Sequence, residues 1–233
     1  MSYEPHTHEA QAAILRHLLF VPYANFASLQ KQTDLTSDHF NFHIKKLLES
    51  GYVEKTADAY TLTRKGKEYA NRMDTDDNTI EKQPKLSVAV IVENEEGKQL
   101  AQQRLKQPYF GYWGRLTGKV RWGETTLEAA ARELMEEAGI TADLEVRGLY
   151  HKMDFEKESG DMLEDKYFIV VFGKNPQGDL IEDFEGGKNQ WMSDEDLLAQ
   201  DTVFESIQEI TKMARGESNF YLEGHYDYEK KNY

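Results

Sequence analysis

Hydrophobic and polar positions follow a helical period through most of the first 75 residues. Four apolar residues near the start share one helical face: Ile14, Leu15, Leu18 and Leu19. The following segment predicts a short helix, a turn, and a longer helix over 37–50, which Thr36 or Ser37 caps and Gly51 ends. Two short strands around a turn at Asp58, and then one more helix, complete this region.

The predicted helix over 37–50 has an apolar face and a polar face. The residues expected to be buried are Phe40, Ile44, Leu47 and Leu48. The residues expected to face outward are Asp38, His39, Phe42, Lys45 and Lys46. This outward face is available for contacts with another molecule.

The segment MDTDDNTIEKQP, residues 73–84, is polar and acidic and ends in proline, which is typical of a connection between domains. Beyond it, the strand-like runs KLSVAVIVE and KYFIVVFG alternate with helical segments, one of them capped by Ser193. This order predicts a mixed α/β domain. The predicted division is a first domain over 1–74, a linker over 75–84, a second domain over 85–215, and a C-terminal tail over 216–233 for which no role is predicted.

The clearest helix signal lies in GKVRWGETTLEAAARELMEEAGI, residues 118–140. Thr125 and Glu128 have the spacing of a capping box, and Gly139 is placed for a left-handed C-terminal cap. The expected apolar stripe is Leu127, Ala130, Ala131, Leu134 and Ala138. The acidic flank is formed by Glu133, Glu136 and Glu137, which repel one another at helical spacing. A cation bound at this flank would remove that repulsion.

Charge is divided unevenly along the chain of 233 residues, whose net charge is −14. Residues 1–75 contain nine basic and nine acidic residues, which leaves 19 basic and 33 acidic residues for the remainder. An acidic domain of this kind repels phosphates unless metal ions intervene. The sequence has no cysteine, no apolar run of about 20 residues and no signal peptide, so we expect a cytoplasmic protein without a membrane partner.

The segment 118–140 resembles the signature of the Nudix hydrolases at every fixed position. The matching residues are Gly118, Glu124, Arg132, Glu133, Leu134, Glu136, Glu137, Gly139 and Ile140. The resemblance extends over about residues 84–215 and implies an α/β/α sandwich with a mixed sheet. It also implies hydrolysis of the diphosphate linkage in a nucleoside diphosphate joined to another moiety.

By this resemblance, Mg²⁺ or Mn²⁺ is held by Glu133, Glu136 and Glu137 with a backbone contact from Gly118. Glu133 or Glu137 would also act as the base on water, and Arg132 would orient a glutamate through a salt bridge. The role of Glu124, structural or within the site, stays open. A further assisting acid is expected among Glu164, Asp165 and Glu185. One departure from the family pattern is Thr117, which replaces a glycine common in relatives.

Substrate contacts are expected from the segment upstream of the signature, QPYFGYWGR. Its aromatic residues are Tyr109, Phe110, Tyr112 and Trp113, which either stack on a base or ribose or pack in the protein. The candidates for substrate binding are Trp113, Tyr112, Arg115 and Glu164. Nothing in the sequence selects one substrate within the class.

Residues 8–74 resemble the winged helix-turn-helix domains of bacterial transcription regulators, especially in LLESGYVEK and YTLTRKGKEYA. The resemblance implies that the helix over 37–50 enters a DNA groove, with candidate contacts from His39, Phe42, Lys45 and Lys46. Winged helices also serve in dimerisation or protein docking, and the neutral charge of this domain supports that alternative to DNA binding. Two interpretations therefore remain. The chain is a Nudix hydrolase with an accessory winged-helix domain, or it is a DNA-binding regulator whose Nudix domain senses a nucleotide such as ADP-ribose or a nucleotide sugar. A homodimer is compatible with both.

Overall fold

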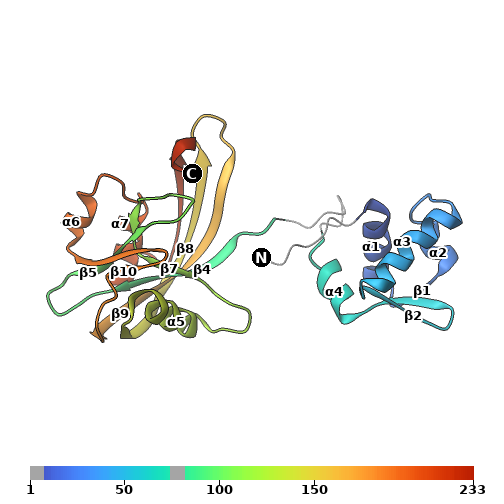
Figure 1. Cartoon of the computed structure of the whole chain (residues 1–233), viewed down its shortest axis with the longest axis horizontal. Helices are drawn as coiled ribbons and strands as arrows, with labels where there is room; N and C mark the ends of the chain where they lie inside the picture. Colours follow the sequence, from blue (N-terminus) through green and yellow to red (C-terminus); the bar gives the residue numbers. More distant parts are fainter. Residues whose placement is uncertain (1–7, 74–81) are drawn as a thin grey trace. The chain divides into compact units, whose positions relative to one another are not determined.

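The computed structural model of the chain describes residues 8–73 and 82–233. The chain divides into two compact units, Met1–Lys82 and Gln83–Tyr233, and Figure 1 labels many of their elements. Most of the predicted linker, 75–84, lies outside the described residues. No helix in the described ranges is both long enough and apolar enough to cross a membrane.

Within residues 8–73, the first unit contains four helices and a small antiparallel sheet with strand order β1-β3-β2. The elements are α1 (Glu9–Phe20), β1 (Ala24–Asn25), α2 (Phe26–Gln30), α3 (Ser37–Glu49), β2 (Val53–Thr56), β3 (Ala59–Leu62) and α4 (Arg64–Ala70). This is the predicted order of helix, two helices around a turn, hairpin and helix. A core that includes Ile14, Leu15, Leu29, Phe40 and Ile44 joins the helices.

Helix α3 has the predicted faces. Phe40, Ile44 and Leu47 are buried and Leu48 is partly buried, whereas the five residues expected to face outward are all exposed. His43, which the prediction assigned to neither face, is buried, and its ring lies 4.3 Å from the ring of His8, centroid to centroid. Thr36 is the N-cap residue, but its side chain makes no capping hydrogen bond.

The second unit is built around two sheets. Its elements are β4 (Lys85–Val92), β5 (Gln99–Arg104), β6 (Trp113–Gly114), β7 (Leu116–Lys119), α5 (Thr126–Ala138), β8 (Thr141–Glu156), β9 (Met162–Gln177), β10 (Asp183–Phe184), β11 (Gly187–Met192), α6 (Asp194–Leu198), α7 (Ile207–Arg215), β12 (Tyr221–Tyr228) and the 3-10 helix η1 (Lys230–Asn232). The larger sheet has the order β12-β8-β9-β4-β7 and the smaller one β10-β11-β5-β6. The larger sheet contains parallel and antiparallel pairs, so the predicted mixed sheet is confirmed.

Strand β4 separates two apolar layers because successive side chains of a strand point to opposite faces. Val88, Val90 and Val92 pack with α5 in one cluster. Ala89 and Ile91 pack with α7 in another. Helices therefore cover both faces of the larger sheet, and the predicted α/β class is confirmed.

The last part of the chain does not form the separate tail expected over 216–233. Strand β12 pairs in parallel with β8 from Tyr221 to Tyr228 and forms one edge of the larger sheet. Residues of β12 alternate between exposed and partly buried positions. An alternating strand can pack one face on a neighbouring layer, which explains why this segment joins the sheet.

Candidate active site

Helix α5 begins and ends where the sequence predicts. Thr125 and Glu128 form both bonds of the capping box, and Gly139 takes the left-handed conformation at φ 71°. The buried stripe is displaced from the predicted one: Leu127 and Ala131 are exposed, and the buried residues are Ala129, Ala130, Leu134 and Ala138. The helix is thus rotated toward Ala129, which turns Glu133 and Glu137 toward the protein.

Gly118 lies directly against the carboxylate of Glu133. A Cβ atom at Gly118 would come within 2.0 Å of Cδ and 2.4 Å of Oε1 of Glu133. Gly118 belongs to β7, the edge strand of the larger sheet. A side chain at this position would fill the space in which the Glu133 carboxylate lies against the strand backbone.

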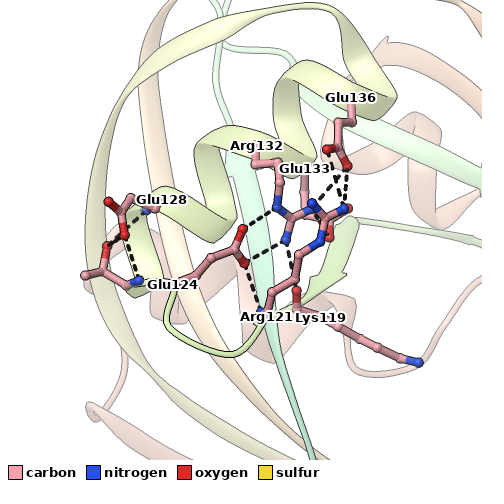
Figure 2. Close-up of polar contacts among 8 residues, drawn as sticks. Lys119, Arg121, Glu124, Glu128, Arg132, Glu133 and Glu136 are labelled. Carbon is pink, nitrogen blue, oxygen red and sulfur yellow. Dashed lines mark hydrogen bonds and ion pairs between the residues drawn. The ribbon is translucent and has the colours of Figure 1, made fainter. Parts of the chain in front are cut away.

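Arg132 connects three acidic side chains, as Figure 2 shows. Its Nε and Nη2 donate to Glu124 at 2.5 and 2.9 Å, and its Nη1 donates to Glu133 at 2.7 Å and to Glu136 at 3.1 Å. Its Nη2 also donates to the carbonyl oxygen of Lys119 at 3.1 Å. These are salt bridges of the kind predicted for Arg132. The bonds from Arg132 and from the backbone N–H of Arg121 lower the pKa of the Glu124 carboxyl to about 2.

Glu136 differs from the other two glutamates in its exposure. Its side chain is 48% exposed, compared with 13% for Glu133 and 17% for Glu137. It accepts hydrogen bonds from Arg132 and, at 3.2 Å, from Nη2 of Arg121 (Figure 2). Glu133 and Glu137 therefore lie on the inner side of the acidic flank, and Glu136 lies on its outer side.

Glu137 is held from a different direction, by residues of the smaller sheet. Gln102 of β5 donates to Oε2 of Glu137 at 3.0 Å, and its amide lies 3.3 Å from Oδ1 of Asn189. Asn189 of β11 donates to the backbone carbonyl of Glu137 at 2.7 Å. Burial raises the pKa of the Glu137 carboxyl, and the bond from Gln102 and the charge of Lys106 oppose this effect. Sequence reasoning did not identify Gln102 or Asn189, because both lie on strands outside the signature.

The chemistry of the acidic flank fits a divalent cation. It offers carboxylate oxygens, the ligands that Mg²⁺ prefers, and two of the three carboxylates are largely buried. The Glu133 carboxylate also lies close to the backbone of Gly118. Within residues 8–73 and 82–233, no three acidic or histidine side chains already converge on one point. The ligands proposed for a metal remain Glu133, Glu136 and Glu137, and Arg132 donates hydrogen bonds to the first two of these.

A cavity adjoins the glutamates on the other side of β7. Gln102 and Thr117 line it together with charged residues of β5, β8 and β9 and with residues around α7. Of the four predicted substrate contacts, Arg115 lines this cavity, whereas Tyr112, Trp113 and Glu164 do not. Tyr109, one of the aromatic residues upstream of the signature, also lines it. Tyr112 packs against Phe204 instead, with ring centroids 5.1 Å apart. Phe110 is exposed.

The three acids expected to assist the site lie in different surroundings. Glu164 is buried and accepts hydrogen bonds from Lys85 at 2.6 Å and from the hydroxyl of Tyr233 at 3.1 Å. Asp165 lies 2.7 Å from Nε2 of His151. Glu185 is exposed. None of these three is among the residues that contact Glu133, Glu136 or Glu137 in the described structure.

The four candidate DNA contacts lie together on the exposed face of α3. His39, Phe42 and Lys45 are exposed, and Lys46 forms an ion pair with Glu49 at 3.0 Å. The Lys46 ammonium also lies 5.9 Å from the ring centroid of Phe42. This face combines aromatic and cationic side chains.

Comparison with known proteins identifies relatives for both units. Residues 83–212 match the family described as NUDIX domain, and residues 3–73 match a family described as a domain of unknown function (DUF7347). The chain is 33% identical over 123 residues to an isopentenyl-diphosphate Delta-isomerase of Serratia proteamaculans, covering 46% of this chain and 67% of that protein. It is 46% identical over 55 residues to an RNA pyrophosphohydrolase of Erythrobacter litoralis, covering 24% of this chain and 34% of that protein.

The chain therefore spans about two thirds of the first relative and one third of the second. Among solved structures, the NUDIX domain of Shewanella oneidensis NrtR complexed with ADP ribose is similar, with a TM-score of 0.49 and 17% identity. That match covers 64% of this chain and 95% of the other.

Proposed function

Because the match to the NUDIX domain, residues 83–212, covers more than half of this chain, the chain belongs to the Nudix family, and we propose that it is a metal-dependent hydrolase. The prediction of a Nudix-type enzyme is thereby confirmed at the level of the family. The proposed reaction cleaves the diphosphate linkage of a nucleoside diphosphate joined to another moiety. The observation that carries this proposal is the inward pair Glu133 and Glu137, one held against Gly118 and the other by Gln102.

Each residue of the site has a distinct part in the proposed reaction. Mg²⁺ or Mn²⁺, held by Glu133, Glu136 and Glu137, would neutralise charge on the phosphate oxygens. Arg132 fixes the rotamers of Glu133 and Glu136, and Glu124 in turn fixes Arg132. Glu137 or Glu133 accepts the proton of the attacking water. Gln102 and Asn189 fix the position of Glu137.

The test is metal-dependent hydrolysis of a panel of nucleoside diphosphate compounds, compared in wild type and in Glu137→Gln. We expect wild type to cleave one class of compound, to lose activity in EDTA and to regain it with Mg²⁺ or Mn²⁺. We expect Glu137→Gln to lose activity by at least about a hundredfold, since a positioned general base contributes at least that much. Glu145→Gln, an exposed acid on β8, is the matched control.

Two outcomes would contradict this proposal. One is a rate that is equal in wild type and Glu137→Gln. The other is isomerisation of a diphosphate compound without its cleavage, which the name of the isomerase relative describes. The panel therefore includes isopentenyl diphosphate, and its isomerisation without any cleavage of nucleoside diphosphates would replace hydrolysis with isomerisation.

A second candidate function is regulation of transcription, and it is favoured by the arrangement of the first unit. Its order of helices and hairpin resembles a winged helix, and α3 presents Phe42, Lys45 and Lys46 on an exposed face. In this alternative, α3 contacts DNA and the second unit binds a nucleotide such as ADP-ribose or a nucleotide sugar. Dimerisation through the same face is the competing use of this unit.

Fluorescence anisotropy of the full chain with random duplex DNA separates these uses. If α3 contacts DNA, the double variant Lys45→Glu/Lys46→Glu lowers affinity and flattens the dependence on salt, because two phosphate contacts are lost. Lys67→Glu, an exposed lysine on α4, is the control. If instead the double variant changes only the sedimentation mass, the face is a dimer contact.

A further inference from the structure

The cavity beside the glutamates is lined by more cations than anions. Its charged lining residues are Arg104, Arg115, Lys152, Lys166 and Asp154. We call this the cationic cavity. The chain as a whole has a net charge of −14, so this concentration of buried positive charge runs against the average of the molecule.

Arg115 has unused hydrogen-bond donors. Its side chain is 2% exposed, and its Nη2 donates to Asp194 at 3.1 Å and to Thr211 at 2.9 Å. Its Nε and Nη1 have no hydrogen-bond partner in the described parts of the chain. Burial lowers the pKa of Arg115 to about 10, although the charge of Asp194 opposes this effect. Buried donors of this kind are nearly always paired in proteins, so a partner is missing here.

Lys152 and Lys166 each lie beside an acid. Lys152 pairs with Asp154, whose other oxygen accepts the hydroxyl of Tyr109 at 3.0 Å. Lys166 lies 3.3 Å from Glu164, which already has a shorter ion pair with Lys85 at 2.6 Å. Burial lowers the pKa of both lysines, opposed by their acidic neighbours. Each oxygen of Asp154 thus already accepts a hydrogen bond, and the cavity has four cationic lining residues for this one acid.

The cationic cavity adjoins the glutamate site through β5 and β7. Gln102, which donates to Glu137, also lines the cavity. Arg104 is close enough to both Glu137 and Glu164 for their charges to raise its pKa against the larger, opposite effect of burial. Thr117 pairs with Ala89 in the sheet, and both line the cavity next to Gly118. Gln102 is the residue that touches both, so a molecule that reacts at the glutamates and passes Gln102 would extend into the cavity.

We propose, resting on the hydrolase function above, that the cationic cavity binds a second anionic group of the substrate. The group is a phosphomonoester or a carboxylate that the substrate carries outside its diphosphate linkage. Lysine and arginine side chains only donate hydrogen bonds, and the oxygens of Asp154 are already bonded. A neutral sugar hydroxyl brings a donor with each acceptor, whereas an anionic group brings acceptors alone. Donor-rich surroundings therefore select the anion.

Matched substrate pairs test the proposal. UDP-glucuronate carries a carboxylate that UDP-glucose lacks, and NADP⁺ carries a phosphomonoester that NAD⁺ lacks. For at least one pair, wild type should have a kcat/KM about tenfold or more higher for the anionic member, as expected when a charged hydrogen bond is gained. The pair that shows the preference identifies the anionic group. A wild type that prefers the neutral member of both pairs, or shows no preference in either, overturns the proposal.

Two variants connect the preference to the cavity. Lys166→Met leaves Glu164 paired with Lys85, and Arg115→Met leaves Asp194 paired with Arg215 at 2.6 Å. In each folded variant, the ratio of kcat/KM between the two members should fall toward one. Lys174→Met, an exposed lysine on the same strand as Lys166, should keep the wild-type ratio. An unchanged ratio in Lys166→Met overturns the proposal, whether or not Arg115→Met folds.

A metal-free measurement separates this proposal from the hydrolase function. If wild type cleaves none of the four compounds, the proposed hydrolysis of this substrate class is wrong. Binding of small fragments in EDTA then tests whether the cationic cavity binds an anionic group. Ligand-observed NMR would compare glucose 6-phosphate and glucuronate with glucose. Binding of an anionic fragment that is at least about fivefold weaker in Lys166→Met supports the site. Equal binding of all three fragments, or none, overturns it.

Discussion

At the scale of single residues, Gly118 is constrained by the carboxylate beside it. A methyl group there would lie 2.0 Å from Cδ of Glu133, so Gly118→Ala must displace that side chain. We expect activity to fall by about 10- to 100-fold, as for changes that disturb the orientation of a metal ligand. Overpacking should lower the free energy of unfolding by about 1–3 kcal/mol. Steady-state kinetics and urea unfolding measure the two effects.

The control for Gly118→Ala is Lys119→Ala, because Lys119 is the next residue of β7 and its side chain is exposed. The hydrogen bond from Arg132 to Lys119 goes to the backbone carbonyl, which this variant keeps. Full activity in Gly118→Ala would show that Glu133 does not need its position against the strand.

Glu124 links the site to stability at low pH. Its carboxyl has a pKa of about 2 in the folded chain, below the ordinary value of 4.5, mainly because of the bond from Arg132. A lowered folded pKa stabilises the protein above the unfolded pKa, and this stabilisation is lost as pH falls from about 4.5 toward 2. Glu124→Gln should thus be less stable than wild type at pH 7 and at pH 5. The difference in melting temperature should narrow below pH about 4.5, and a difference that stays constant down to pH about 3 would contradict the assignment.

Residues of the candidate site were predictable to the extent that they share one local motif. Glu133, Glu136, Glu137 and Arg132 occur within six positions of each other, so spacing alone places them on one helix flank. Gln102 and Asn189 reach Glu137 from two other strands, and only the pairing of β5 with β11 brings them together. Their polar side chains carry no signal in the sequence that separates them from surface residues.

At the scale of elements, the start of α5 depends on the capping box. The hydroxyl of Thr125 accepts the backbone N–H of Glu128, and the Glu128 carboxylate accepts the backbone N–H of Thr125 at 2.8 Å. Thr125→Ala should lower the free energy of unfolding by about 1 kcal/mol, as is typical of lost N-caps. Thr126→Ala, the next residue, lacks these bonds and is the control. Equal urea midpoints for the two variants would show that the box contributes nothing.

Elements with strong local signals were predicted well, and those that depend on neighbours were not. The caps of α5 and the hairpin of β2 and β3 follow from residue types at fixed spacing. Strand β12 is rich in tyrosine and charge, and its place beside β8 comes from tertiary contacts, including the hydroxyl contact between Tyr150 and Tyr226. The rotation of α5 toward Ala129 is likewise fixed by packing on the sheet, because alanines at several positions fit an apolar stripe equally well.

At the scale of the whole molecule, the division into two units predicts two separate thermal transitions. A ligand that binds one folded unit raises the free energy of unfolding of that unit alone, by about 2.7 kcal/mol at a concentration 100 times the dissociation constant. The melting temperature of that unit rises accordingly. The proposed metal ligands all lie in Gln83–Tyr233. In calorimetry, Mg²⁺ or Mn²⁺ should therefore raise the melting temperature of one transition and leave that of the other unchanged. In Glu137→Gln the response should disappear. Without metal, this variant should be at least as stable as wild type, because a largely buried charge has been removed. Equal shifts of both transitions, or a full response in Glu137→Gln, would mean that the cation binds elsewhere than the acidic flank of α5.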